Sequence, residues 1–280
     1  MTMVGSITHS LNEIGIKKGD ILYIPSDITT FMVDAQKLYS VRTSDDRKLF
    51  LNSFIDVLQN IVSSEGTILF PIFTWTFNRG KAFDVRNTLG EVGALPNWIL
   101  KNRSDFKRTQ HPMYSFLVWG KDTDILLKMN NVNCWGQYSP FGYMYRKNAK
   151  TLFFNVSIRR GFTFSHYVEE VLQVPYRYYK NFHGEYIDID GNTTQRNYVM
   201  YVRELDIISQ EYSPDSFYEK NGIVKSSTIH NSMVKVMDCQ KAFDLIKDDF
   251  LNNGGRYMYK FENYTLDWTK EHTHADEINN

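Results

Sequence analysis

Cysteine is scarce in this chain of 280 residues, since only Cys134 and Cys239 are present. Two cysteines are too few for the disulfide framework of a small secreted protein, and their separation does not match a zinc site. Long apolar runs are also absent, and no stretch approaches the roughly 18 apolar residues that a membrane span requires. Residues 1–12 lack the basic segment and apolar run of a signal peptide. We therefore predict a soluble, cytoplasmic protein that does not bind membranes.

The chain has no excess of charge of either sign, because Lys plus Arg and Asp plus Glu both number 32. Proteins that bind nucleic acid or anionic membranes usually carry a basic excess, so we do not expect nucleic acid as a partner. Apolar residues make up 42% of the chain, which is enough for a sizeable core. Aromatic residues make up 15%, which is compatible with a homodimer without requiring one.

Several common signatures of catalysis and binding do not occur. The strings G-x-x-x-x-G-K-[ST] and G-x-G-x-x-G are both missing, which disfavours the standard nucleotide-binding loops. The G-x-S-x-G nucleophile elbow is missing too, which disfavours an α/β-hydrolase. Asp188, Asp190 and Asn192 resemble the start of a calcium loop, but Thr193 replaces the glycine that such a loop requires. We interpret this stretch as a hairpin turn and predict no bound metal.

Hydrophobic periodicity predicts alternating helices and strands, as in an α/β fold. Apolar positions between residues 49 and 62 share one helical face, which follows a capping box at Thr43 and Asp46. We predict a single α/β domain over residues 1–268, with a mixed, mostly parallel sheet flanked by helices, and a disordered tail over 269–280. The other expected features are strands at 21–24, 67–74, 115–119 and 151–155, helices at 89–101 and 163–172, a polar excursion at 33–44, a β-rich excursion near 180–205, and a last strand and helix within 226–250.

The most informative string is T-F-S-H-Y-V-E, from Thr163 to Glu169. On a helix, His166 and Glu169 are three residues apart and share a face. A carboxylate beside an imidazole fixes the tautomer of the ring and stabilises its protonated form, which suits a general base near neutral pH. The same spacing also occurs on solvated helix faces. A metal half-site is a third interpretation, although the sequence offers no second cluster of ligands.

Three further strings precede this one, namely P-I-F-T at 71–74, R-T-Q-H-P-M-Y-S at 108–115 and Y-S-P-F-G at 138–142. In this order and spacing, the four strings resemble the motifs of the aminoglycoside 3-N-acetyltransferase family: P-x-F-T, R-S-x-H-P-x-x-S, an S-P pair and T-x-x-H-x-x-E. The resemblance runs from about residue 19 to about residue 175, and more faintly beyond. The chain departs from the family at Asp27 and Thr109, where serine is usual.

The resemblance implies a fold like that of this family and direct transfer of an acyl group from acetyl-CoA, or another acyl-CoA, to an amine. It implies that His166 takes the proton from the attacking amine, that Glu169 orients His166, and that the Thr163 hydroxyl lies beside the thioester. The residues that it implies for the CoA channel or the thioester are Ser26, Thr74, His111 and Ser115, and Arg108 lies in a basic stretch that the CoA phosphates could use. Serine and threonine at strand ends also commonly satisfy only the loop backbone.

Two adjacent arginines, Arg159 and Arg160, lie directly before the catalytic string. Near His166 they would repel a polycationic aminoglycoside and could hold a pyrophosphate, although a solvated loop or a structural ion pair would explain them equally well. We predict that the acceptor is a small-molecule amine, namely a nucleotide-linked amino sugar such as those used for surface polysaccharides. An aminoglycoside is the alternative. A non-catalytic relative that serves as a binding subunit and a metal-dependent hydrolase are the remaining hypotheses.

Overall fold

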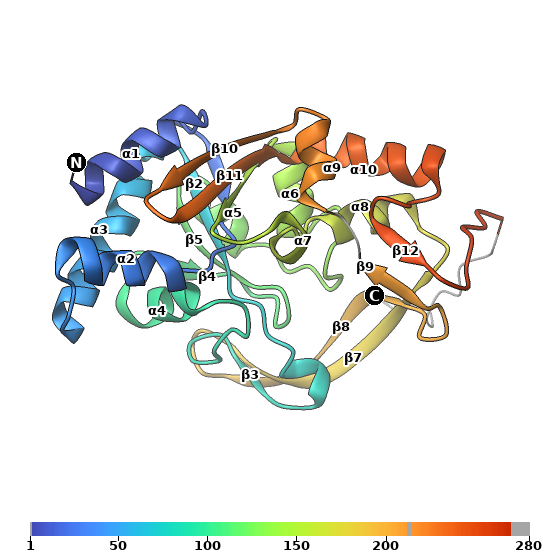
Figure 1. Cartoon of the computed structure of the whole chain (residues 1–280). Helices are drawn as coiled ribbons and strands as arrows, with labels where there is room; N and C mark the ends of the chain where they lie inside the picture. Colours follow the sequence, from blue (N-terminus) through green and yellow to red (C-terminus); the bar gives the residue numbers. More distant parts are fainter. Residues whose placement is uncertain (1, 212–213, 270–280) are drawn as a thin grey trace.

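A mixed sheet of seven strands forms the centre of the computed structural model, which describes residues 2–211 and 214–269 (Figure 1). In order across the sheet, the strands are β10 (Val224–Ile229), β11 (Ser232–Asp238), β6 (Lys150–Phe154), β1 (Ile21–Tyr23), β2 (Thr67–Pro71), β5 (Phe116–Gly120) and β4 (Lys107–Arg108). Strands β6, β1 and β2 are parallel, whereas the pairs on either side of them are antiparallel. The predicted mixed α/β fold is confirmed, and its parallel part lies in the middle of the sheet.

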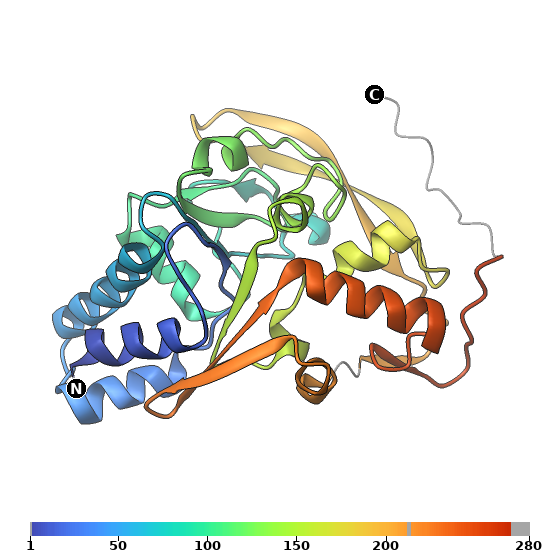
Figure 2. The ribbon, with the colours of Figure 1, turned by 90° about the horizontal axis from the view of Figure 1, so that it is seen from above.

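The two faces of this sheet belong to two different hydrophobic cores. Because successive side chains of a strand point to opposite faces, Leu22 and Ile68 enter one core while Tyr23 and Leu69 enter the other. Helices α1 (Met3–Glu13), α2 (Thr29–Tyr39), α3 (Ser44–Val62) and α4 (Ala94–Asn102) cover the first core. Helices α6 (Pro140–Arg146), α8 (Ser165–Leu172) and α10 (Cys239–Asn253) cover the second. Figure 2 shows α1 to α3 and α10 on opposite sides of the central strands.

The capping box at the start of α3 is confirmed. The Thr43 hydroxyl accepts a hydrogen bond from the Asp46 amide at 3.1 Å, and the Asp46 carboxylate accepts one from the Thr43 amide at 2.9 Å. The polar excursion expected at 33–44 is wrong, because most of this segment lies in α2. Its buried carboxylate, Asp34, accepts hydrogen bonds from Asn231 near the other end of the chain. Sequence polarity does not reveal such a long-range partner.

The β-rich excursion is a long hairpin of β7 (Arg177–Ile187) and β8 (Thr193–Arg203), which pairs with β3 (Phe83–Asp84). At its tip, the Asp188 carboxylate accepts hydrogen bonds from the amides of Asp190 and Asn192, and Gly191 takes a φ of 90°. A turn stabilised in this way confirms the hairpin interpretation of the calcium-like string. A third, two-stranded sheet contains β9 (Ser209–Glu211) and β12 (Tyr259–Phe261).

Other boundaries differ modestly from the predicted ones. Helix α8 begins at Ser165 rather than Thr163, and the single strand expected within 226–250 is the antiparallel pair β10 and β11. The tail predicted for 269–280 lies outside the described residues except for Thr269, and the domain limit at 268 stays a prediction. Within the described residues, no helix is long and apolar enough to cross a membrane. The shorter helices are α5 (Thr123–Leu127), α7 (Ile158–Gly161), α9 (Asp215–Lys220) and the 3-10 turn Phe77–Arg79.

Candidate active site

The string from Thr163 to Glu169 lies at the carboxyl end of the parallel strands. Strand β6 ends at Phe154, which forms a bridge to Ser26, and the chain then turns through α7 into α8. The Asp215 carboxylate accepts a hydrogen bond from the first amide of α7 at 2.9 Å, and the Tyr23 hydroxyl donates to its last carbonyl, that of Gly161, at 3.0 Å. Since the carboxyl edge of parallel strands commonly holds ligand sites, this position suits a reacting group.

The spacing prediction for His166 and Glu169 is confirmed in geometry. His166 Nδ1 lies 2.6 Å from Glu169 Oε2, and Glu169 is fully buried whereas 27% of the His166 side chain is exposed. A carboxylate oxygen only accepts hydrogen bonds, so the proton of the neutral ring is on Nδ1. Nε2 is then the nitrogen with a free lone pair, which is what a general base requires.

Glu169 is held in its charged form by groups on neighbouring elements. The Tyr176 hydroxyl donates to Oε1 at 2.5 Å, and Arg177 Nη2 lies 2.9 Å from Oε2. Burial disfavours the carboxylate, but Arg177 and the hydrogen bonds from His166 and Tyr176 outweigh it and lower the pKa of Glu169 to about 2. Glu169 is therefore ionised throughout the physiological range and fixes the orientation of the imidazole.

Arg177 is a site residue that the sequence analysis missed. Its Nη2 lies 3.2 Å from His166 Nδ1, and its Nη1 donates to the Tyr201 carbonyl at 2.9 Å. Burial disfavours the cation, but the adjacent Glu169 raises the pKa of Arg177. Arg177 is the first residue of β7, so neither helical spacing nor a family string connects it with His166. We call His166, Glu169, Tyr176 and Arg177 the His166 cluster.

Trp135, also missed, covers one face of the imidazole. The centroids of the two rings are 4.8 Å apart, and Trp135 is buried. The segment that carries Trp135 is held by Asn133, whose side chain accepts a hydrogen bond from the Trp135 amide at 3.2 Å and donates to Glu170 Oε1 at 2.5 Å. Burial raises the pKa of Glu170 to about 7, against the opposing effect of the hydrogen bonds from Asn133 and Tyr179. The Trp135 indole therefore shields part of the His166 ring from solvent.

The other predicted residues of the site divide between its edge and the protein interior. Thr163 is half-buried just before α8, and its carbonyl accepts a hydrogen bond from the His166 amide at 3.1 Å. Ser26 is half-buried beside the end of β6, and its hydroxyl has no hydrogen-bond partner within the described part of the chain. Arg159 and Arg160 are exposed on α7. The roles assigned to these four residues stay predictions.

Arg108 and Ser115 lie inside the protein instead. Arg108 Nε donates to Ser115 Oγ at 3.0 Å, and its other nitrogens donate to the carbonyls of Ile72 at 3.3 Å and Thr88 at 2.5 Å. Burial lowers the pKa of Arg108 to about 10. Because its N–H groups are used by neutral acceptors of the protein, this geometry does not support Arg108 as a ligand of the CoA phosphates. We call Arg108, Ser115 and these carbonyls the Arg108 cluster.

His111 and Thr74 are fully enclosed as well. His111 Nδ1 accepts hydrogen bonds from the amides of Met113 and Tyr114 at 3.3 and 3.1 Å, and burial lowers the pKa of His111 to about 3. Thr74 Oγ1 donates to Glu91 at 3.1 Å. Both side chains hold the loops that follow β2 and precede β5. Their predicted contacts with the thioester stay predictions.

No group of three or more His, Cys, Asp or Glu side chains in residues 2–211 and 214–269 is arranged to hold a metal ion. The hypothesis of a metal-dependent hydrolase therefore has no candidate ligand set in this part of the chain. General-base chemistry at His166 stays a prediction.

Comparison with known proteins identifies the family and the fold. A family model described as aminoglycoside 3-N-acetyltransferase matches residues 38–250. The SPbeta prophage-derived aminoglycoside N(3')-acetyltransferase-like protein YokD of Bacillus subtilis (strain 168) is 22% identical over 283 residues, covering 91% of this chain and 94% of YokD. The crystal structure of YokD has a TM-score of 0.67 at 20% identity, covering 89% of this chain and 99% of that one.

Two further solved structures share the fold. AAC-IIIb in a binary complex with CoASH has a TM-score of 0.69 at 16% identity, and covers 87% of this chain and 94% of its own. AAC-VIa bound to sisomicin has a TM-score of 0.68 at 16% identity, and covers 89% of this chain and 97% of its own.

Proposed function

Because this chain belongs to the aminoglycoside 3-N-acetyltransferase family, we propose that it transfers an acyl group from acyl-CoA to the amine of a small molecule, with His166 as the general base. The observation that carries this proposal is the buried contact between His166 Nδ1 and Glu169, which leaves Nε2 at the exposed edge of the ring. The complex of AAC-IIIb with CoASH supports acyl-CoA as the donor.

In this mechanism the amine nitrogen attacks the thioester carbonyl and forms the new C–N bond. Nε2 of His166 takes the proton that the amine must lose, while the C–S bond breaks and CoA leaves with its sulfur as the thiolate. The protonated ring then returns the proton to that sulfur. Glu169 stabilises the imidazolium during this step, and Arg177 keeps Glu169 ionised and in place. No covalent acyl-enzyme is needed.

We further propose that the acceptor is a nucleotide-linked amino sugar. Arg159 and Arg160 are exposed on α7, the element directly before the catalytic helix, where they suit the pyrophosphate of such a substrate. An aminoglycoside is the second candidate, and the complex of AAC-VIa with sisomicin favours it. The complete set of contacts in the His166 cluster speaks against a relative that has kept only a binding role.

A free-thiol assay for CoA release tests these proposals. Acetyl-CoA would be combined with a panel of nucleotide-linked amino sugars and aminoglycosides, using wild type and His166→Ala. We expect acceptor-dependent release that falls about 10²–10⁴-fold in the variant, as is usual for loss of a general base. If no acceptor of the panel causes CoA release and calorimetry detects no CoA binding, the non-catalytic relative would be the better interpretation.

A matched pair of charge variants tests the acceptor class. Arg159→Gln/Arg160→Gln should raise KM for a nucleotide-linked amino sugar about tenfold, because each lost arginine contact with phosphate is a charge-assisted hydrogen bond. Arg42→Gln/Arg47→Gln removes two exposed arginines near the start of α3 and should leave KM unchanged. Efficient turnover of sisomicin, with none of the sugar nucleotides, would overturn the acceptor proposal and retain the acyltransferase.

A further inference from the structure

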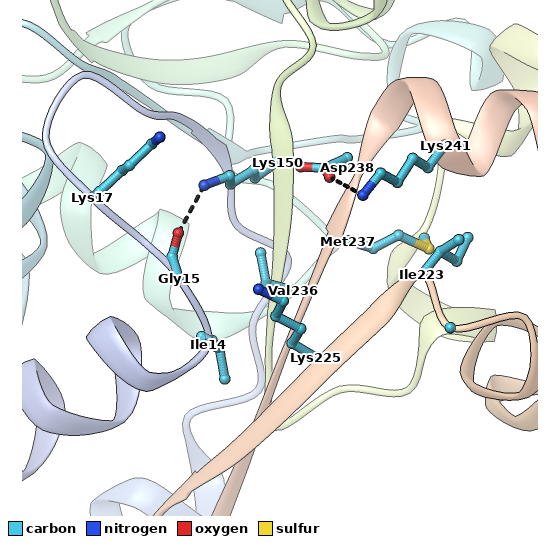
Figure 3. Close-up of a pocket in the computed structure, with 11 residues that line it drawn as sticks. Ile14, Gly15, Lys17, Lys150, Ile223, Lys225, Val236, Met237, Asp238 and Lys241 are labelled. Atoms are coloured by element: carbon cyan, nitrogen blue, oxygen red, sulfur yellow. Dashed lines mark hydrogen bonds and ion pairs between the residues drawn. The ribbon is translucent and has the colours of Figure 1, made fainter.

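A cavity of about 270 Å³ lies at the edge of the central sheet opposite the candidate active site. It is formed where β6 begins, whereas the catalytic string follows the end of β6. With a rise of roughly 3.3 Å per residue, the length of β6 separates the two sites by about 13 Å. The charged residues that line it are Lys17, Lys150, Lys225, Asp238 and Lys241 (Figure 3).

Four lysines but only one carboxylate line this cavity. Lys150 Nζ is held 2.7 Å from Asp20, just outside the lining, and Lys241 Nζ lies 3.3 Å from Asp238. In the part of the chain that the structure describes, no carboxylate forms an ion pair with Lys17 or Lys225. Two uncompensated positive charges therefore remain, in a chain whose overall charge is zero.

Gly15 brings two of the ammonium groups together. Its carbonyl accepts a hydrogen bond from Lys150 Nζ at 2.8 Å, which is drawn in Figure 3. Lys225 Nζ lies 3.5 Å from the position that a Cβ atom on Gly15 would occupy. Two lysines from different strands thus flank one residue of the loop after α1, and an anion beside this residue would be attracted by both.

The remaining walls strengthen this preference. Ile14, Ile223, Val236 and Met237 supply apolar surface between the charged side chains. Helix α10 begins beside the cavity, and its 15 residues direct the positive end of the helix dipole toward it. Asp238 precedes this helix but makes no side-chain capping bond, and its carboxylate pairs with Lys241 instead.

We propose that this cavity binds a phosphate-bearing small molecule, with the ammonium group of Lys225 on the phosphate, Lys150 fixed on the other side of Gly15, and Lys17 adding attraction from the rim. The phosphate could belong to CoA itself or to a separate metabolite, because the chemistry recognised is the same. The apolar walls suit the non-phosphate part of such a molecule. The site is separate from His166, so it does not depend on the acyl transfer proposed above.

Calorimetric titration with inorganic pyrophosphate at low salt tests the site, with Arg159→Gln/Arg160→Gln present in every protein compared, so that the arginines proposed above to hold a pyrophosphate do not contribute. Lys17→Gln/Lys225→Gln should weaken binding at least tenfold, and binding to wild type should weaken as salt is raised. Lys37→Gln/Lys128→Gln removes two exposed lysines elsewhere and should bind like wild type. The four substituted lysines are exposed, so the thermal midpoint of unfolding should stay constant and show that each variant folds. Equal affinity in all three proteins, or no binding at millimolar pyrophosphate, would overturn the proposal.

Titration with CoA on the same proteins identifies the source of the phosphate. A parallel tenfold loss of CoA affinity in Lys17→Gln/Lys225→Gln would assign the site to the phosphates of CoA. Unchanged CoA affinity, with pyrophosphate binding still lost, would assign it to a separate ligand. His166→Ala should bind pyrophosphate like wild type. Failure of acyl transfer and failure of this site would thus be seen in different experiments.

Discussion

Two arginines with the same burial have opposite surroundings in this protein. Arg108 and Arg177 are each 7% exposed. Arg177 pairs with the Glu169 carboxylate, and this attraction raises its pKa. Arg108 donates hydrogen bonds to a hydroxyl and to backbone carbonyls, and burial lowers its pKa to about 10. Arg177 thus keeps the neighbouring Glu169 charged, whereas Arg108 connects loops through neutral hydrogen-bond acceptors.

The two clusters also differ in their access to solvent. The His166 cluster reaches the surface through the imidazole, 27% of whose side chain is exposed. In the Arg108 cluster, Ser115 is completely buried and accepts from Arg108, and its own hydroxyl lies 3.3 Å from the Ile72 carbonyl. Chemistry on a bound substrate is therefore expected from the first cluster and loop geometry from the second.

The largest effect is expected when Arg177 is replaced. Arg177→Met leaves Glu169 as a buried carboxylate without its cation, which should cost about 3–5 kcal/mol of stability. Urea unfolding at pH 7 would measure this loss. Glu169→Gln/Arg177→Met should lose much less than the sum of the single variants, because neither charge is then stranded. Additive losses would show that the pair is not coupled, and the contrast with Arg108 would fail.

Replacement of Arg108 should be milder. Arg108→Met leaves neutral carbonyls unpaired but strands no opposite charge, so we expect a loss of about 2–3 kcal/mol. The kcat/KM of the folded variant should stay within about threefold of wild type, because Arg108 has no role in the proton transfer. Urea unfolding together with the CoA-release assay would check both statements. A large drop in kcat/KM at full stability would instead return Arg108 to the reaction site.

The contrast between the clusters also shows how far the sequence could predict this site. His166 and Glu169 lie on one helix, so their contact follows from helical spacing alone. Arg177 and Trp135 reach His166 from a strand and a loop, and only the tertiary fold brings them there. Arg108 was predicted to bind phosphate because its charge is visible in the sequence, whereas its burial is not.

The fold divides in the same way. The hairpin turn at Gly191 and the capping box of α3 depend on residues within a few positions of each other, and both were predicted correctly. The helix across 33–39 was missed because the partner of its buried Asp34 is Asn231, far along the chain. Local signals therefore predicted the capping box, the hairpin turn and the contact between His166 and Glu169, and long-range contacts decided the rest.

Glu170 resembles Arg108 in being a buried ionisable side chain with neutral hydrogen-bond partners, but it is an acid. It is a buried carboxyl whose hydrogen-bond partners, Asn133 and Tyr179, are neutral, and its pKa is raised from 4.5 to about 7. Between these two pH values the folded protein keeps a proton that the unfolded chain has released. Stability therefore falls as the pH rises through this window.

Glu170→Gln removes the titration and keeps an oxygen to accept from Asn133. The variant should be more stable than wild type by about 1–2 kcal/mol at pH 8, and the difference should vanish near pH 4, where Glu170 is protonated in both states. Urea unfolding of both proteins across this range would measure the effect. Glu185→Gln, a change at an exposed position of β7, serves as the control and should show no such trend. A stability difference that stays the same at all pH values would mean that the pKa of Glu170 does not change on folding. The contrast between Glu170 and Glu169 would then fail.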